Sequence, residues 1–115
     1  MDTLARLQQR WEQLLAELKS LGPMRSGSIC PLTIRSTDKS GALKAHGPYL
    51  IHTYKHHGKT ITRRLRDPQQ IETCRRQIAN FRRFEQLTAE LARLGRQLAE
   101  REEMEPRDQK KTSKR

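Results

Sequence analysis

Residues 48–66 read PYLIHTYKHHGKTITRRLR, and this stretch predicts a β-hairpin. β-Branched and aromatic residues alternate with polar ones on both sides of His57-Gly58, a dipeptide suited to a two-residue turn. With the turn at that point, residues whose numbers sum to 115 face each other, so Leu50 lies opposite Leu65 and Ile51 opposite Arg64.

A hairpin alone is only marginally stable in water, so a further strand or a helix must support it. The alternation of Cys30, Leu32 and Ile34 predicts an additional strand over residues 28–35. The intervening residues 36–45, STDKSGALKA, are mostly small, polar or charged, and we expect a loop there.

A helix is predicted before the β region, over residues 3–21. Its apolar residues recur every three or four positions, which makes a narrow seam of the coiled-coil kind. The seam consists of Leu4, Leu7, Trp11, Leu14, Leu18 and Leu21. Asp2 or Thr3 can cap the start of this helix, and Gly22-Pro23 would end it. The seam requires a partner helix, in this chain or in another.

A second, longer helix is predicted to begin at Asp67. Asp67 suits the N-cap, Pro68 the first helical position and Gln70 the capping-box position. A helical apolar pattern then continues to about residue 104, with two three-residue steps between Phe81 and Leu87. Because such steps move the seam around the helix, we expect a change of partner there. The first half would pack on the β region and the second half on the first helix.

The sequence therefore predicts an α+β fold: an N-terminal helix, a small antiparallel sheet or β-hairpin, and a long C-terminal helix with coiled-coil-like pairing. We expect one domain over residues 1–104 and a disordered basic tail over 105–115. No apolar run spans a bilayer, the N-terminus does not resemble a signal peptide, and the two cysteines, Cys30 and Cys74, suit a reducing cytoplasm as free thiols.

The charge of the chain is concentrated in its middle. Residues 24–66 hold nine Lys and Arg against the single acid Asp38, whereas residues 1–23 and 67–104 each balance to zero. Arginine binds phosphate with two parallel hydrogen bonds, and a β-ribbon is one of the shapes that enters a DNA groove. The predicted nucleic-acid-binding residues are Tyr49, Lys55, Lys59, Arg63, Arg64, Arg66, Arg75, Arg76, Arg82 and Arg83.

The expected partner is thus nucleic acid, DNA ahead of RNA, contacted through phosphates with little sequence choice. We expect no membrane partner, and a homo-oligomer, such as a dimer, formed through the helices. The alternative is an oligomeric structural or interaction protein whose basic patch docks an acidic protein.

Catalytic chemistry is not expected. Asp38 is the only acid between residues 18 and 66, which excludes a carboxylate pair there. His52, His56 and His57 have no carboxylate or cysteine near them in sequence, and adjacent histidines at a turn should point apart, so we expect no metal site. No cofactor is expected either.

Five segments occur in a recognisable order: Leu21-Gly22-Pro23-Met24, Gly27-Ser28-Ile29, His46-Gly47-Pro48-Tyr49, Gly58-Lys59-Thr60, and IANFRRF at residues 78–84. In this the chain resembles a family of short bacterial and archaeal proteins classed as a domain of unknown function, over about residues 1–95. The resemblance implies the helix–hairpin–helix layout and a link to mobile elements. The family's usual cysteine cluster is missing here, so any metal function of the family does not transfer to this chain.

Overall fold

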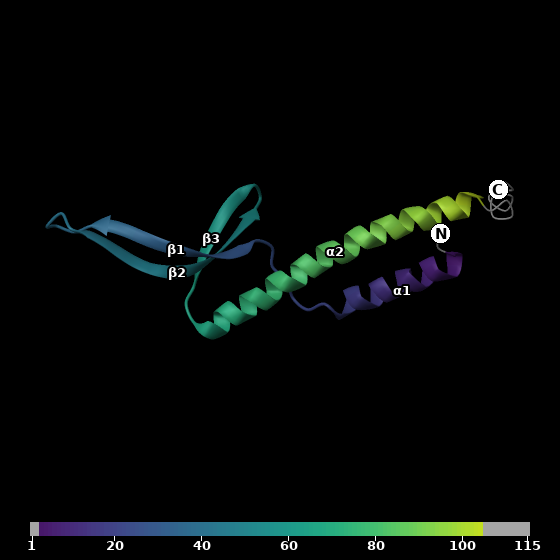
Figure 1. Ribbon diagram of the computed structural model, residues 1–115, viewed down its shortest axis with the longest axis horizontal. Coiled ribbons are helices and arrows are strands. Elements are labelled where there is room, and N and C mark those ends of the chain that lie inside the picture. Colours follow the sequence, from purple (N-terminus) through teal and green to yellow (C-terminus); the bar gives the residue numbers. More distant parts are fainter. Residues whose placement is uncertain (1–2, 105–115) are drawn as a thin grey trace. The chain divides into compact units, whose positions relative to one another are not determined.

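The computed structural model describes residues 3–104 and shows the α+β architecture that the sequence predicts (Figure 1). The elements in chain order are α1 (Leu4–Ser20), β1 (Ser28–Thr37), β2 (Leu43–His56), β3 (Lys59–Leu65) and α2 (Pro68–Met104). The predicted disordered tail, residues 105–115, and Asp2 as a cap lie outside the described residues. No helix within residues 3–104 is long and apolar enough to cross a membrane.

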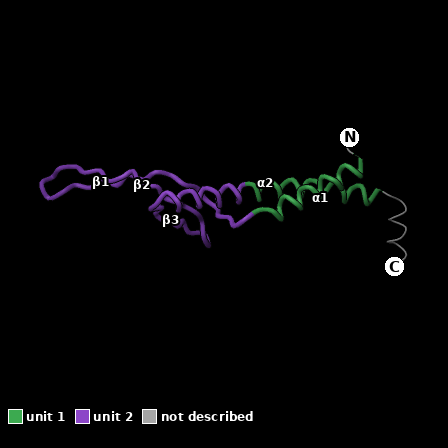
Figure 2. Tube along the Cα trace, turned by 90° about the horizontal axis from the view of Figure 1, so that it is seen from below, with its two compact units in different colours: residues 1–21, 83–115 green, residues 22–82 purple. Residues whose placement is uncertain are grey.

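The chain packs into two compact units, coloured separately in Figure 2. Within the described residues, the helical unit comprises residues 3–21 and 83–104, and the sheet unit comprises residues 22–82. The boundary within α2 falls between Arg82 and Arg83, inside the interval from Phe81 to Leu87 where the seam shifts. The expected change of partner along this helix is thus confirmed. The prediction of a single domain over 1–104 stays a prediction.

In the helical unit, α1 lies antiparallel to the second half of α2. Arg10 pairs with Glu90 and Glu17 with Arg83, so rising numbers in α1 meet falling numbers in α2. The core is made by four buried leucines, Leu7, Leu14, Leu87 and Leu94, flanked by Trp11, Leu18, Leu21, Leu91 and Leu98. The seam of the first helix is therefore satisfied within this chain. The predicted homo-oligomer stays a prediction. The leucine seam does not support it, because the seam is already packed within the chain.

Gly95 offers a stabilising substitution in this unit. A Cβ placed there would lie 3.5 Å from Cζ3 and 3.8 Å from Cη2 of Trp11, which is ordinary van der Waals contact. Since glycine inside a helix costs about 0.5–1 kcal/mol relative to alanine, we expect Gly95→Ala to stabilise the unit by about that amount. Thermal unfolding followed by Trp11 fluorescence measures it. Gly95→Leu is the comparison: its larger side chain must displace the Trp11 ring, so it should destabilise the unit. A lower unfolding midpoint for Gly95→Ala than for the unaltered protein would contradict the prediction.

The sheet unit contains a three-stranded antiparallel sheet in the order β1-β2-β3. β2 and β3 pair in the predicted register, from Leu50 with Leu65 to His56 with Lys59. His57 has φ 51° and Gly58 φ 79°, which are the two left-handed positions of a type I′ turn. The hairpin and its two-residue turn are confirmed.

The loop predicted over residues 36–45 is confirmed only for residues 38–42, and its predicted bounds are wrong. β1 continues to Thr37 and β2 already begins at Leu43, so the two strands pair almost to the end of this ribbon. The turn between them is closed by Asp38, whose Oδ1 accepts hydrogen bonds from the backbone N–H of Ser40 at 2.9 Å and of Ala42 at 3.0 Å. Local composition favoured a loop, whereas cross-strand hydrogen bonding extends the strands.

One face of the sheet packs on the first half of α2. Because side chains alternate along a strand, Leu50, His52 and Tyr54 share this face, and Leu65 joins them from β3. The buried cluster consists of Leu65, Cys74 and Ile78, with Ile29, Leu50 and Ile71 packed around it. Both cysteines, Cys30 and Cys74, are free thiols as expected, and Cys74 is buried.

The start of α2 is capped as predicted, with one difference. The Gln70 backbone N–H donates to Oδ1 of Asp67 at 2.7 Å, which is the N-cap bond. Oε1 of Gln70 reaches back one residue further than a capping box requires and accepts from the Arg66 N–H at 2.7 Å. At the other helix, Thr3 is the cap, since its Oγ1 accepts from the Arg6 N–H at 3.2 Å.

Candidate nucleic-acid interface

The two units differ in net charge. The sheet unit, residues 22–82, holds twelve Lys and Arg against three Asp and Glu, a net of +9. The described part of the helical unit, residues 3–21 and 83–104, holds seven of each and is neutral. Within residues 3–104, the excess positive charge therefore belongs to one compact unit.

In the helical unit the basic and acidic side chains neutralise each other. Arg10 binds Glu90 through two hydrogen bonds, at 2.8 and 3.1 Å, and Nε of Arg83 lies 2.5 Å from Glu17. The hydrogen bond from Arg83 lowers the pKa of Glu17 and raises that of Arg83, and the Arg10–Glu90 pair behaves in the same way. The structure thus places Arg83, one of the predicted binding residues, in an ion pair of the helical unit.

In the sheet unit the acids leave most of the basic side chains unpaired. Within residues 22–82 the single ion pair joins Lys44 to Asp38, at 3.8 Å between Nζ and Oδ2. Asp38 is engaged further by Ser40 and Ala42, whose hydrogen bonds lower its pKa below the ordinary value. Asp38, the only acid in the β region, therefore serves mainly to stabilise a tight turn.

Seven of the predicted binding residues are exposed in the sheet unit: Lys55, Lys59, Arg64, Arg66, Arg75, Arg76 and Arg82. The strand register places Lys55 and Arg64 on one face of the sheet, and Lys59 and Arg63 on the other. The hairpin therefore presents positive charge from both faces, and its lysines and arginines are not one flat patch.

Tyr49 and Arg64 form a preassembled pair. The guanidinium carbon of Arg64 lies 3.7 Å from the centroid of the Tyr49 ring, which is a cation–π contact. One ring face of Tyr49 is thus occupied by a cation, and Arg64 is held in place by it. Both residues line a shallow pocket with Pro48, Leu50, Leu65, Arg66 and Ile71.

Arg63 has a different environment from the other hairpin arginines. It faces α2, where its Nε donates to Nδ1 of the buried His52 at 3.0 Å, and Nη2 lies 3.7 Å from Sγ of Cys74. Because Nδ1 accepts this bond, the proton of neutral His52 is on Nε2, which donates to the Ser26 carbonyl at 2.8 Å. Arg63 is therefore held rigidly on the packed side of the sheet, half-buried.

A residue outside the predicted set lies close to Arg63. Arg25 and Arg63 both line a pocket of about 330 Å³. The other lining residues are Asp67, Gln69, Gln70, Thr73, Cys74 and Gln77. The backbone N–H of Arg25 donates to the Gln77 carbonyl at 3.0 Å, and its Nε donates to Oε1 of Gln77 at 2.9 Å. Arg25 is isolated in sequence, with no basic neighbour or periodic pattern, so only the packing of the loop on α2 reveals it.

The three histidines of the hairpin have different environments. His52 is 1% exposed and stacks on Tyr54, with ring centroids 4.9 Å apart. The expectation that His56 and His57 point apart is wrong: their rings are in edge contact, with centroids at 4.1 Å, because His57 has left-handed backbone geometry. Among the described residues, 3–104, no three side chains of the metal-binding types come together.

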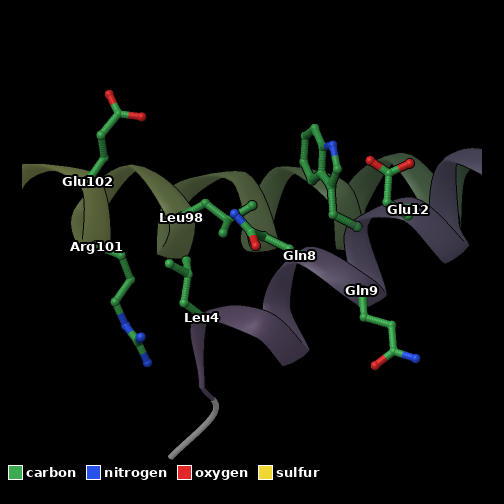
Figure 3. Close-up of a pocket in the computed structure, with 8 residues that line it drawn as sticks. Leu4, Gln8, Gln9, Glu12, Leu98, Arg101 and Glu102 are labelled. Atoms are coloured by element: carbon green, nitrogen blue, oxygen red, sulfur yellow. The ribbon is translucent and has the colours of Figure 1, made fainter. Parts of the chain in front are cut away.

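The helical unit also has a pocket, near the first turns of α1 and the last turns of α2 (Figure 3). It is lined by Leu4, Gln8, Gln9, Trp11, Glu12, Leu98, Arg101 and Glu102. Leu4 points toward α2 and Leu98 extends toward Gln8, whereas Gln9 and Glu102 point in opposite directions. The polar groups do not converge on one point, as a ligand site requires.

These features define a small α+β protein with a charge-balanced helical pair and a strongly basic three-stranded sheet unit. Comparison of the chain with protein-family models, with curated proteins and with solved structures finds no match. The likeness to a domain family of unknown function therefore remains a resemblance.

Proposed function

We propose that this protein is a basic, non-catalytic accessory protein that binds nucleic acid, DNA ahead of RNA, through the phosphate backbone and with little sequence specificity. The observation that carries the proposal is the segregation of charge. The sheet unit has a net charge of +9 with a single internal ion pair, whereas the charges of residues 3–21 and 83–104 in the helical unit cancel.

Self-repulsion of this size destabilises a small unit unless a polyanion relieves it, and the counterions that nucleic acid releases supply the driving force for binding. Arginine predominates over lysine among the exposed candidates, and its planar guanidinium group suits bidentate contacts with phosphate. Arg64 is already oriented by Tyr49, so part of the ordering cost is met before binding.

The test is a binding titration of the protein with duplex DNA and duplex RNA at several salt concentrations. Each phosphate contact contributes about −0.9 to the slope of log K against log salt for B-DNA, so six contacts would give a slope of about −5. We expect a steep slope, and similar affinities for unrelated sequences. No binding at low salt, or a response that does not depend on salt, would reject the proposal.

A triple variant then locates the contacts. Lys55→Ala, Lys59→Ala and Arg66→Ala together remove three exposed charges whose side chains make no hydrogen bond or ion pair with residues 3–104. We expect the salt slope to become shallower by about 2–3. The control variant, Arg93→Ala with Arg96→Ala, removes charge from the neutral unit and should leave the slope unchanged. Equal effects of the two variants would show that only total charge matters.

An unaltered chain that binds an acidic protein but no nucleic acid would instead favour an interaction protein. The same triple variant reads out that outcome in a binding assay with the acidic partner. The salt titration is therefore the experiment that separates the two functions.

A further inference from the structure

The guanidinium of Arg63 is half-buried and is not bonded directly to an anionic group within residues 3–104. Its two hydrogen-bond partners, the neutral His52 ring and the Cys74 sulfur, carry no negative charge. No ion pair within residues 3–104 includes Arg63. A partly desolvated guanidinium with no directly bonded anion is suited to an anion supplied from outside.

The geometry of Arg63 leaves donors for such an anion. A guanidinium has five N–H groups, of which one is directed to His52 and one to Cys74. The other three have no acceptor among residues 3–104. Because His52 is 1% exposed and fixed to Ser26, the orientation of this fork is set by buried groups rather than by solvent.

Arg25 faces the same pocket and is oriented independently. Oε1 of Gln77 accepts its Nε–H at 2.9 Å, which leaves the Nη groups of Arg25 and the amide NH₂ of Gln77 as donors. Gln70, also in the lining, has its Oε1 engaged by Arg66, so its amide NH₂ is a donor too. Four side chains with N–H donors not used in these bonds thus line one pocket of about 330 Å³.

We infer that this pocket, defined by Arg25, Arg63, Gln70 and Gln77, binds one phosphodiester group of the nucleic-acid backbone. The inference rests on the proposed function for the source of that phosphate. Planar guanidinium forks match two phosphate oxygens each, and the amide donors complete a site that is rich in donors and takes an acceptor-only ligand.

The third charge in the lining selects the kind of phosphate. Asp67 opposes the two arginines, so the pocket carries a net charge of +1. A phosphodiester has one negative charge and neutralises it, whereas doubly charged phosphate would leave an excess negative charge beside the Asp67 carboxylate. The pocket therefore favours the diester of a nucleic-acid chain over free phosphate.

The pocket is tested first without nucleic acid. Dimethyl phosphate is titrated into the ¹⁵N-labelled protein while the Nε–H signals of its arginines are followed by NMR. We expect saturable shifts of Arg25 and Arg63, with Arg96, which is exposed in the helical unit, as the internal control. Shifts of similar size in all arginines, or none in Arg63, would overturn the assignment. Tighter binding of inorganic phosphate in the parallel titration would also overturn it.

The second test uses charge-conserving variants with duplex DNA. Arg25→Lys keeps the charge but loses the fork and the bond to Gln77, and we expect about a tenfold loss of affinity. Arg96→Lys, the same exchange at an exposed position of the charge-balanced helical unit, should leave the affinity within about twofold. Equal affinities of Arg25→Lys and the unaltered protein would refute the phosphate contact while leaving the proposed function intact. Failure of the unaltered protein to bind the duplex refutes the proposed function, and the dimethyl phosphate titration then judges the pocket alone.

Discussion

Gly27→Ala is expected to destabilise the sheet unit by about 4 kcal/mol, in the range that marks a forced backbone movement. Gly27 has φ +96°, and a Cβ on it would lie 2.0 Å from the Thr53 carbonyl oxygen and 2.8 Å from Cβ of Tyr54. Neither obstacle is the end of a flexible side chain, so the strand β2 itself would have to shift. Amide hydrogen exchange in β2 and β3 measures the loss in the unit concerned.

Gly41→Ala is the matched control for this substitution. Gly41 has a similar backbone angle, φ +86°, but no atom lies within 4 Å of the position its Cβ would take. The cost there is the left-handed backbone alone, about 1–2 kcal/mol. If both variants lost the same protection, the close approach of Gly27 to β2 would not be what excludes a side chain.

His52→Phe is the second large effect, an expected loss of about 3 kcal/mol. Phenylalanine fills a similar volume, but it cannot accept from Nε of Arg63 or donate to the Ser26 carbonyl. Each buried polar group left without a partner costs about 1–3 kcal/mol. The same substitution frees Arg63 from its fixed orientation, so duplex affinity should fall as well.

His56→Phe provides the comparison, because His56 is exposed in the same strand and makes no side-chain hydrogen bond within residues 3–104, while its ring contact is with His57. We expect a change within about 0.5 kcal/mol in β-strand protection. A comparable loss in both variants would indicate that aromatic substitution in β2, rather than the loss of the His52 hydrogen bonds, destabilises the sheet.

Several residues that carry the family resemblance have a structural role in the fold. Gly27 permits the close approach to β2, and Gly58 occupies the left-handed turn position. Nδ2 of Asn80 donates to the Pro23 carbonyl at 2.9 Å, which ties the loop after α1 to α2. The peptide bond before Pro48 is cis and Gly47 has φ +115°. These residues therefore contribute to the structure of the sheet unit.

The candidate interface was only partly predictable. Charge along the sequence locates the basic region, because net charge depends on composition and not on packing. It does not separate Arg63 from Arg64, which are neighbours in sequence but occupy opposite faces of β3. Nor does it show that Arg83 pairs with Glu17, since those residues come together only when α1 and α2 pack.

The amino-acid sequence by itself determined the local structure: the two helices with their caps, the register of the β2–β3 hairpin, and the point along α2 where its packing partner changes. These features follow from periodicity, turn chemistry and capping, which act over a few residues. Tertiary structure alone decided that the leucine seam pairs within the chain, that the strands β1 and β2 extend into the expected loop, and that Arg25 meets Arg63 in one pocket. Each of these depends on contacts between residues far apart in the chain, and no local pattern encodes them.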